Sequence, residues 1–515
     1  MFQIIVSVLL ATLIATVYFY VKQIFSYWKR RGIPYATPSF PFGNFGATFS
    51  KKQSFGQSLQ DLYNSTDAPV LGIYTSIRPA VLVRDPKITR DILIKDFQSF
   101  WHRGFHYDDN VDSLASNLFS YSGDGWKSMR AKLSPAFTTG KLKAMFGTIT
   151  DCANALEKYL NKLAVAQKEI EIRDVFARFT TNVIASVAFG IEIDCFENPD
   201  NEFRKYGWRF FEPKFKHLVR FNISLLSPFL TKLLGIRFAD KDVEMFMKNI
   251  IRQTLEYREQ NNVSRKDFLQ LLMQLRNTGK VHDDDDDWTT KTTSDEKSLS
   301  LDEMSAQSYV FFIAGYESSS TTMSFCMYEF AKCPEIQQKA YEEITNVLQK
   351  HDGKLTYEAL ADMKYLESCI DETLRLNPPF EFFSRECTQD YKVANSNLII
   401  EKGTPVLFSV MGPHYDPKYY DEPEKFNPDR FKDDQSANKN SLEMPYLAFG
   451  DGPRNCIAKR LGKFQAKLGI CLLLRKFSFE LGEQHVNKPL VFNPTSGVRA
   501  PISGINLKVF SRLNK

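Results

Sequence analysis

The stretch Ala448–Gly462, "AFGDGPRNCIAKRLG", places one cysteine in a short loop that is followed by a helical pattern. Gly450 and Gly452 permit a tight turn in this loop. Arg454 puts a positive charge two residues before Cys456, and the N–H groups at the start of the following helix would also stabilise an anion there. The sequence therefore predicts a thiolate at Cys456, which could act as a nucleophile or as a metal ligand.

The size and composition of the chain exclude several classes of protein. With 515 residues, 43% of them hydrophobic, the chain can bury a large core. The formal net charge is only +5, so the global basic field of a nucleic-acid-binding protein is missing and we expect no nucleic-acid partner. The eight cysteines form no CxxC pair and have no regular spacing, which favours reduced thiols in a cytosol-facing compartment over disulfides or a zinc ribbon.

The N-terminus is predicted to be a membrane anchor. Residues Phe2–Val21 carry no charge, and about 20 such residues can cross a bilayer as a helix. A cleaved signal peptide is the alternative, but the stretch lacks a basic start and a small-residue cleavage site. Basic residues follow it, and they predict that the body of the protein lies in the cytoplasm. We expect an anchor with a basic stop segment over residues 1–31 and a proline-rich connector over 32–46.

The remainder, residues 47–515, is predicted to be one domain that is mainly α with small β-sheets. Periodicity predicts helices around Ala153–Ala166, Val243–Tyr257 and Tyr328–Lys350. Strands are expected at Val70–Tyr74, Ala80–Val83, Leu398–Ile400, Val406–Ser409 and Ile505–Phe510. An aspartate-rich stretch, His282–Ser298, is interpreted as a solvated loop rather than a calcium site, because the glycine and glutamate of a calcium loop are missing.

The surroundings of Cys456 bear on which chemistry it performs. None of the seven histidines lies within twenty-five residues of it, which weakens but does not exclude a nucleophilic cysteine. A haem iron needs only the thiolate. The loop resembles the haem-binding loop of the cytochrome P450 family, with Phe449, Gly450, Gly452, Arg454 and Cys456 at the family's positions. The resemblance implies the P450 fold, with a single catalytic domain behind an N-terminal transmembrane anchor, and heme b with Cys456 as its axial ligand.

The resemblance extends over essentially the whole chain. "DETLRLNPP" and "FNPDRF" match the family's charged network, which implies that Glu372, Arg375 and Arg430 support the cysteine loop structurally. An isolated pair three residues apart on a helix would otherwise be an ordinary surface ion pair. "GDGWKSMRAKLSPAF" and "FFSREC" match family segments that contact the haem propionates. The implied propionate donors are Trp126, Arg130, Arg385 and Arg454.

In "SYVFFIAGYESSSTTMSF", a run of hydroxyl residues follows small residues inside an apolar pattern. Without the resemblance this is a polar patch on a buried helix, whose hydroxyls bond back to the preceding turn. The resemblance implies the distal helix, with Glu317 and Ser318 as the acid and the alcohol that deliver protons. The family usually has threonine at the position of Ser318 and glycine at that of Ala458. Serine lacks the methyl group of threonine, so its side-chain rotamer should be less well fixed. We therefore expect the enzyme to release more peroxide.

By family position, the substrate pocket is lined by an aromatic and apolar set, which implies a lipophilic substrate. The predicted members are Phe105, Leu118, Phe119, Phe311, Ala314, Phe380, Phe382 and Phe383, with the turn near Pro494–Val498. The chain is most similar to insect microsomal P450s that process insecticides, plant toxins and terpenoid or steroid-like compounds.

The resemblance implies a monooxygenase in the endoplasmic reticulum membrane with its catalytic domain in the cytoplasm. No nucleotide-binding GxGxxG unit or flavin module is visible, so electrons should come from NADPH-cytochrome P450 reductase, with cytochrome b5 as a second donor. Basic residues that could receive a reductase, or form a solvated face, are Lys127, Lys132, Lys459 and Arg460. The alternatives are a P450-like isomerase or lyase that needs no reductase, and a haem-binding sensor without turnover.

Overall fold

A computed structural model describes residues 1–165, 169–212, 214–282, 284, 287–290, 298–394, 396–432 and 442–512. The chain packs as two compact units and passes between them more than once. Unit 1 comprises residues 1–105, 381–421 and 442–455, and unit 2 comprises 106–380, 422–441 and 456–515. The predicted division into 1–31, 32–46 and 47–515 stays a prediction. Most of the aspartate-rich stretch lies outside the described residues.

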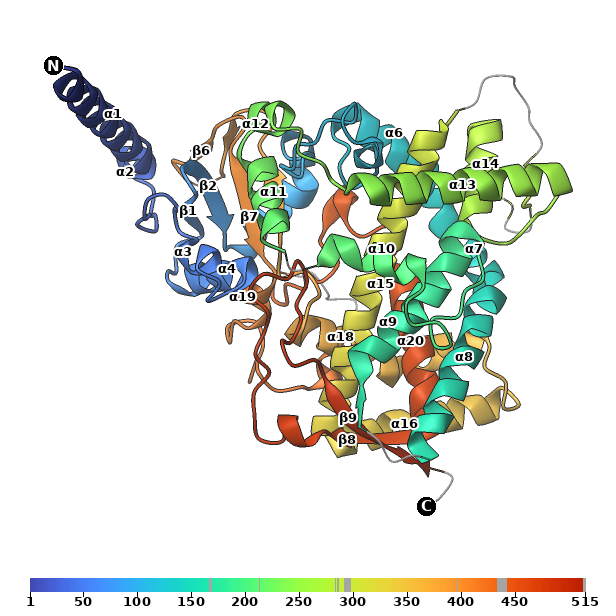
Figure 1. Ribbon diagram of the computed structural model, residues 1–515. Helices are drawn as coiled ribbons and strands as arrows, with labels where there is room; N and C mark the ends of the chain where they lie inside the picture. The colour runs from blue at the N-terminus through green and yellow to red at the C-terminus, as the bar shows by residue number, and fades with distance from the viewer. Residues whose placement is uncertain are drawn as a thin grey trace. The chain divides into compact units, whose positions relative to one another are not determined.

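Unit 1 is built on a four-stranded sheet with the strand order β1-β2-β7-β4 (Figure 1). β1 (Val70–Thr75) and β2 (Arg78–Val83) form an antiparallel pair. β7 (Pro405–Ser409) runs parallel to β2, and β4 (Phe382–Glu386) runs antiparallel to β7. β5 (Tyr391–Lys392) and β6 (Ile399–Ile400) form a separate antiparallel pair.

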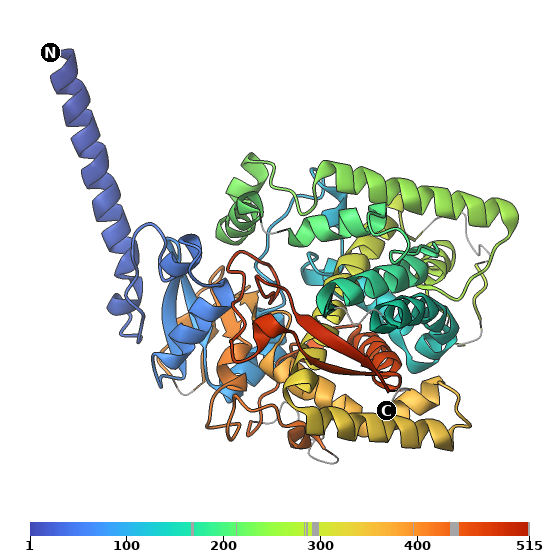
Figure 2. The ribbon, with the colours of Figure 1, turned by 60° about the horizontal axis from the view of Figure 1, so that its bottom comes forward.

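Helices and turns complete unit 1, beginning with the exposed helix α1 (Phe2–Phe25), which extends away from the sheet (Figure 2). α1 is the one helix among the described residues that is long and apolar enough to cross a membrane, with a mean hydropathy of 2.4 and no buried residue. The other helices are α2 (Tyr27–Arg30), α3 (Gly46–Phe49), α4 (Phe55–Asn64), α5 (Pro86–Arg90) and α19 (Met411–His414). Single turns lie at Asp91–Lys95, Phe97–Ser99 and Gly452–Arg454.

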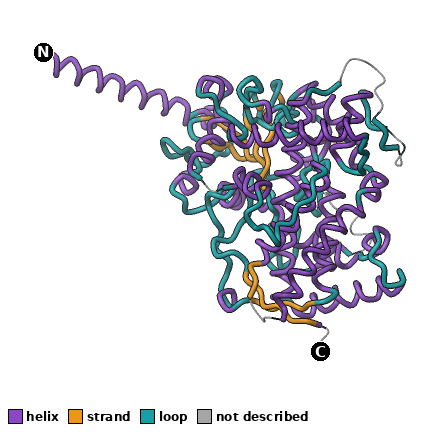
Figure 3. Tube along the Cα trace, turned by 45° about the vertical axis from the view of Figure 1, so that its right-hand side comes forward, coloured by secondary structure: helices purple, strands orange, loops and turns teal. Residues whose placement is uncertain are grey.

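Unit 2 is mainly helical, as the colouring by secondary structure shows (Figure 3). Its central helix is α15 (Leu301–Lys332), which is buried over most of its length and contacts α9 (Ile172–Ile184), α18 (Lys364–Leu376) and α20 (Lys459–Leu474). A helix that is buried on most of its sides has no separate solvent-facing polar stripe, which explains the weakly amphipathic sequence of α15. A capping box at Ser300 and Glu303 starts α15 by satisfying free backbone N–H groups.

The other elements of unit 2 surround this centre. The helices are α6 (Gly123–Leu133), α7 (Thr139–Ala144), α8 (Phe146–Val165), α10 (Glu202–Phe211), α11 (Phe215–Leu226), α12 (Pro228–Leu233), α13 (Lys241–Asn261), α14 (Phe268–Thr278), α16 (Pro334–Lys350) and α17 (Tyr357–Asp362). Short turns lie at Ser113–Ala115, Ser134–Phe137, Ala185–Phe189, Pro428–Phe431 and Glu483–His485. A three-stranded sheet has the order β3-β9-β8, with β3 (Glu169–Glu171), β8 (Phe477–Leu481) and β9 (Asn506–Ser511).

The structure confirms the predicted fold class and all five predicted strands. One predicted helix, Tyr328–Lys350, is wrong as a single element, because α15 ends at Lys332 and α16 begins at Pro334. Proline lacks a backbone N–H and fits only the first turn of a helix, so Pro334 opens α16 rather than continuing α15. The helical pattern after the cysteine loop is confirmed as α20, which begins at Lys459.

Candidate functional site

The loop before Cys456 is fixed by tight backbone contacts within unit 1. Gly450 and Gly452 both have positive φ, at 66° and 68°. A Cβ on Gly452 would lie only 1.9 Å from the carbonyl oxygen of Leu93, so no side chain fits there. The backbone N–H of Leu447 donates to Nε2 of the fully buried His414 (2.9 Å). The loop conformation is therefore determined by packing as well as by its glycines, while Phe449 is half-buried beside it.

Cys456 is the first residue of the last segment of unit 2, residues 456–515. It is the one exposed cysteine of the eight, all of which lie among the described residues. It precedes Ala458, the N-cap of α20, by two residues, so it lies at the N-terminal end of this helix, where the helix dipole favours an anion. Burial lowers the pKa of Arg130 on α6, and the charge of Cys456 raises it. Cys456 and Arg130 are thus within electrostatic reach, while Trp126, one turn earlier on α6, is buried.

Three arginines gather within unit 1. Arg385 on β4 and Arg454 in the cysteine loop are 1% and 2% exposed. Arg103 Nη2 donates to the carbonyl oxygen of Arg454 (3.4 Å), and the charge of Arg103 acts on Arg385. Burial, reinforced by Arg103, lowers the pKa of the Arg385 guanidinium far below its usual range. A cluster of buried cations is costly unless an anion compensates it.

Arg385 tests whether the residues present fit a haem. Its Nη1 donates to the carbonyl oxygen of Ser384 (2.8 Å), but its buried Nε has no hydrogen-bond partner among the described residues. A carboxylate is the natural partner for such a donor, and haem carries two propionates. The residues therefore fit the group. Sequence reasoning missed Arg103, because "WHRGF" carries no periodic signal and only the fold brings it to Arg385.

Glu372, Arg375 and Arg430 come together in unit 2 as the sequence predicted. Glu372 and Arg375, both on α18, are fully buried and bonded twice, with Arg375 Nε and Nη2 donating at 2.7 and 2.9 Å. Glu372 Oε1 also accepts from Arg430 Nε (3.3 Å) and from the backbone N–H of Asn427 (2.9 Å). The carboxylate joins α18 to the Pro428–Phe431 turn. Their role in supporting the cysteine loop stays a prediction.

Glu317 and Ser318 lie on α15 but their side chains have separate partners. Glu317 is 1% exposed and forms an ion pair with Arg173 Nη2 on α9. Ser318 is half-buried, and its hydroxyl donates to the carbonyl oxygen of Ala314 one turn earlier (2.5 Å). Such a bond within the helix is the behaviour expected of a serine inside a long helix. Arg173 was not predicted, because it is 144 residues from Glu317 in the sequence.

Ala314 and Gly315 differ in their surroundings. Ala314 is exposed, although α15 is otherwise mostly buried there, so no described residue covers the helix at this position. A Cβ on Gly315 would lie 2.5 Å from the Cδ1 atom of Ile184. Gly315 therefore serves the close packing of α15 against α9, and Ala314 is the small residue that opens space.

Two sets of bonds fix the predicted pocket loop that carries Leu118 and Phe119. The fully buried Gln307 on α15 accepts from the backbone N–H of Leu118 (2.9 Å) and donates to the carbonyl oxygen of Ser116 (2.9 Å). Both Leu118 and Phe119 remain half-buried. The amide side chain of Gln307 thus attaches the loop before Trp126 to α15.

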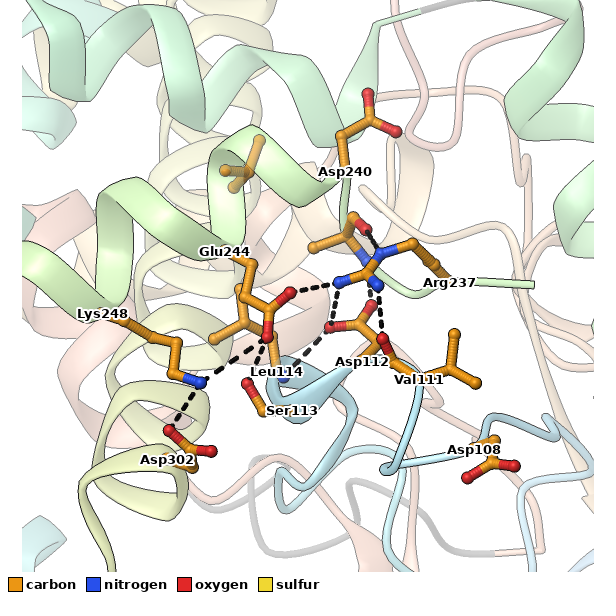
Figure 4. Close-up of polar contacts among 12 residues, drawn as sticks. Asp108, Val111, Asp112, Ser113, Leu114, Arg237, Asp240, Glu244, Lys248 and Asp302 are labelled. Carbon is orange, nitrogen blue, oxygen red and sulfur yellow. Dashed lines mark hydrogen bonds and ion pairs between the residues drawn. The ribbon is translucent and has the colours of Figure 1, made fainter. Parts of the chain in front are cut away.

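The second set holds the start of this loop to the segment before α13 (Figure 4). The buried Asp112 accepts from the backbone N–H of Ala239 (2.8 Å) and lies 3.6 Å from Arg237 Nη2. Arg237 also pairs with Glu244, which accepts from Ser113 Oγ (2.6 Å). Burial raises the pKa of Asp112.

The predicted aromatic lining falls into different surroundings. Phe311 is 8% exposed and stacks on Phe268 at 4.6 Å, so its ring is part of an aromatic cluster in unit 2. Phe383 stacks on Phe408 at 5.0 Å in one hydrophobic core cluster of unit 1. Phe382 packs against a second cluster of unit 1, which includes Leu407. Phe380 is 47% exposed and Phe105 is half-buried. The role of these five rings in a pocket stays a prediction.

A cysteine thiolate is the protein ligand of iron in haem-thiolate proteins, and the exposed Cys456 before α20 fits this role. A family model described as Cytochrome P450 matches residues 34–509. The chain belongs to the cytochrome P450 family.

Several curated insect proteins are similar to the chain over nearly its whole length. "Probable cytochrome P450 6d5" of Drosophila melanogaster is 40% identical over 92% of this chain and 94% of that protein. "Cytochrome P450 6d3" of Musca domestica is 39% identical over 98% of each. "Cytochrome P450 6k1" of Blattella germanica is 39% identical over 97% of this chain and 96% of that protein.

The protein is therefore a P450 monooxygenase that binds heme b. It receives electrons from a redox partner and acts on a lipophilic substrate. The exposed apolar helix α1 is consistent with membrane anchoring.

Proposed function

We propose that this monooxygenase oxidises lipophilic foreign compounds, such as insecticides and plant toxins, or terpenoid or steroid-like compounds of the organism itself. Its electrons come from NADPH-cytochrome P450 reductase, with cytochrome b5 as a second donor. The chain resides in the endoplasmic reticulum membrane, with residues 47–515 as the catalytic domain on the cytoplasmic side. The observation that carries the chemistry is Cys456, an exposed thiol at the start of α20 in a chain whose other cysteines are at least half-buried.

The proposed cofactor site uses groups that are far apart in the sequence. Cys456 would bind the iron, and Trp126, Arg130, Arg385 and Arg454, with Arg103 added to this set, would hold the propionates. Phe449 is assigned to the same cofactor-binding loop. The bound haem supplies reductive activation of dioxygen and transfer of one oxygen atom into a C–H or C=C bond. The network of Glu372, Arg375 and Arg430 keeps the segments around the thiolate in register.

Proton delivery is assigned to Glu317 and Ser318 on α15. The carboxylate of Glu317 is held toward α9 by Arg173, so it has to leave Arg173 or act through water to supply a proton. Ser318 can donate its hydroxyl proton only by releasing the carbonyl oxygen of Ala314. The exposed face at Ala314 is where the proposed distal space begins, with Leu118 and Phe119 as its nearest candidates for substrate contact.

A reductase surface is proposed at four basic residues of unit 2. Lys127 and Arg460 are exposed, and Lys132 and Lys459 are half-buried. Their positive charge is complementary to an acidic partner, and such complementarity raises association rates at low salt.

One experiment tests the proposal against its alternatives. The purified holoenzyme is reduced under carbon monoxide, and then receives reductase, NADPH and a panel of lipophilic compounds. A Soret band typical of thiolate–CO haem with NADPH-dependent product supports the monooxygenase. The band without turnover indicates a sensor, and conversion of peroxides alone indicates an isomerase or lyase. Cys456→Ala should lose the band, while Cys152→Ala, at a half-buried cysteine, should keep it.

A further inference from the structure

The junction between α1 and the sheet of unit 1 is built around one buried tryptophan. Trp28 follows a helix whose residues up to Tyr20 are all exposed, yet its own side chain is 0% exposed. Its indole Nε1 donates to the carbonyl oxygen of Ile73 on β1 (3.0 Å). A Cβ on Gly72 would lie 2.5 Å from the indole ring, so the strand provides a fitted seat for Trp28. A buried tryptophan whose N–H is satisfied is a strong local anchor.

Further contacts attach the end of α1 itself. Tyr74 on β1 donates its hydroxyl to the carbonyl oxygen of Phe25 (3.0 Å) and accepts from the backbone N–H of Trp28 (3.3 Å). The rings of Phe25 and Tyr74 also meet edge to face at 5.2 Å. These bonds hold the last turn of α1 against the same strand that seats Trp28.

Charged and polar groups near β6 form further contacts with the residues around Trp28. Glu401 accepts from the hydroxyl of Tyr27 (2.8 Å) and forms an ion pair with Arg31. The guanidinium of Arg31 lies over the ring of Tyr27, at 3.6 Å from its centroid. The residues on both sides of Trp28 are thereby fixed to unit 1.

The connector is part of the sheet rather than a free tether. The backbone N–H of Gly72 donates to the carbonyl oxygen of Pro34 (2.8 Å), and that of Ala36 donates to the carbonyl oxygen of Gly72 (3.0 Å). A bridge between Tyr35 and Gly72 runs parallel to β1. A proline-rich linker is usually a semi-rigid spacer without such bonds. We call the contacts of Phe25–Ala36 with β1 and Glu401 the anchor socket.

The length of α1 places the socket with respect to lipid. At about 1.5 Å per residue, the exposed stretch Phe2–Tyr20 is about 29 Å long, close to the roughly 30 Å of a bilayer hydrocarbon core. The socket contacts begin with Phe25, about one turn later, and Lys22 lies between them. No stretch of free chain remains as a spacer between the apolar span and the β-sheet.

We propose that the anchor socket makes α1 and the sheet of unit 1 one rigid body, which holds unit 1 directly at the bilayer surface in a fixed orientation. The inference rests on the proposed membrane location and adds to it how the body is attached. The partner surface is the lipid headgroup region around Tyr27, Lys29 and Arg30, where tyrosine and basic side chains are favoured.

The test measures the distance between α1 and the sheet in the membrane-bound, full-length holoenzyme. Spin labels are introduced as unnatural amino acids at Leu13 and Lys402, both exposed, and electron–electron distances are recorded in phosphatidylcholine and phosphatidylserine vesicles. The socket predicts one narrow distance in the wild type. Gly72→Ala, which forces Trp28 out of its seat, should broaden it. The matched control is Gly46→Ala, where the nearest atom to an added Cβ is 3.7 Å away, and it should not change the distance.

A second measurement uses trypsin, because cleavage after the exposed Lys29, Arg30 or Arg31 requires their hydrogen-bonded backbone to unfold locally, which opens the socket. Overpacking in Gly72→Ala should raise the open population and speed release of the body from vesicles by about fivefold to 160-fold, because cleavage follows the open population. Trp28→Ala should act in the same direction, and each variant is checked for an unchanged thiolate–CO band. A broad distance in the wild type, or distance and cleavage that neither substitution changes, would overturn the socket.

The same samples separate this inference from the proposed membrane location. Flotation of the wild type with the vesicles is recorded before any labelling or cleavage. If the protein does not float, the membrane location is wrong. If it floats but the distance is broad, α1 is a flexible tether and the socket alone is wrong.

Discussion

Removing the carboxylate of Glu372 should destabilise the protein far more than removing an ordinary ion pair. Glu372 accepts two bonds from the fully buried Arg375 and one from the backbone N–H of Asn427. In Glu372→Ala the guanidinium of Arg375 keeps its charge at 0% exposure without its acidic partner. Stranding one member of a buried pair costs about 3–5 kcal/mol, so the free energy of unfolding should fall by about that amount.

The assay is urea unfolding of the holoenzyme, followed by tryptophan fluorescence and by loss of the thiolate–CO band. The control is Lys339→Ala, which breaks the pair of Lys339 and Asp429 at 3.2 Å, where both side chains are about half exposed. That loss should be about 0–1 kcal/mol, because water replaces the partner. If Glu372→Ala lowered the free energy of unfolding no more than Lys339→Ala does, the Glu372 carboxylate would not be compensating the buried charge of Arg375.

Three further predictions follow from single residues. Ser318→Thr should lower the ratio of peroxide to product per NADPH consumed, because the added methyl restricts the hydroxyl rotamer; an unchanged ratio would refute this. Gly452→Ala should strongly reduce haem incorporation, measured as the thiolate–CO band per protein, because the added Cβ would lie 1.9 Å from a carbonyl oxygen. Gly462→Ala is the control: its added Cβ meets open space, so haem incorporation should not change. Burial raises the pKa of Glu367, but Lys463 and Lys467 outweigh it and lower that pKa from 4.5 to about 2. The carboxylate therefore stabilises the fold above about pH 4.5 and loses this effect as pH falls toward 2, so the stability difference between wild type and Glu367→Gln should shrink below pH 4.5; a difference independent of pH would contradict it.

Much of the fold followed from local pattern. The apolar N-terminal helix, the five strands and the helices after Ala153 and Val243 were recognised because periodicity and charge-free length are local properties. The break at Pro334 was missed, since the apolar spacing continues through it while the backbone cannot. The small residues before the hydroxyl run are visible in the sequence, but only packing revealed that Ile184 lies against Gly315.

The sequence by itself determined the chemistry: a cysteine between glycine turns and a helix start, an acid and an arginine three residues apart, and a charge-free anchor. Only the tertiary structure decided which distant groups these residues meet. Arg103 joins Arg385, Arg173 holds Glu317, and Trp28 is seated on Gly72. The physical reason is that burial and ion pairing depend on contacts between segments far apart in the chain, whereas turn, helix and membrane signals are set by residues that are neighbours in sequence.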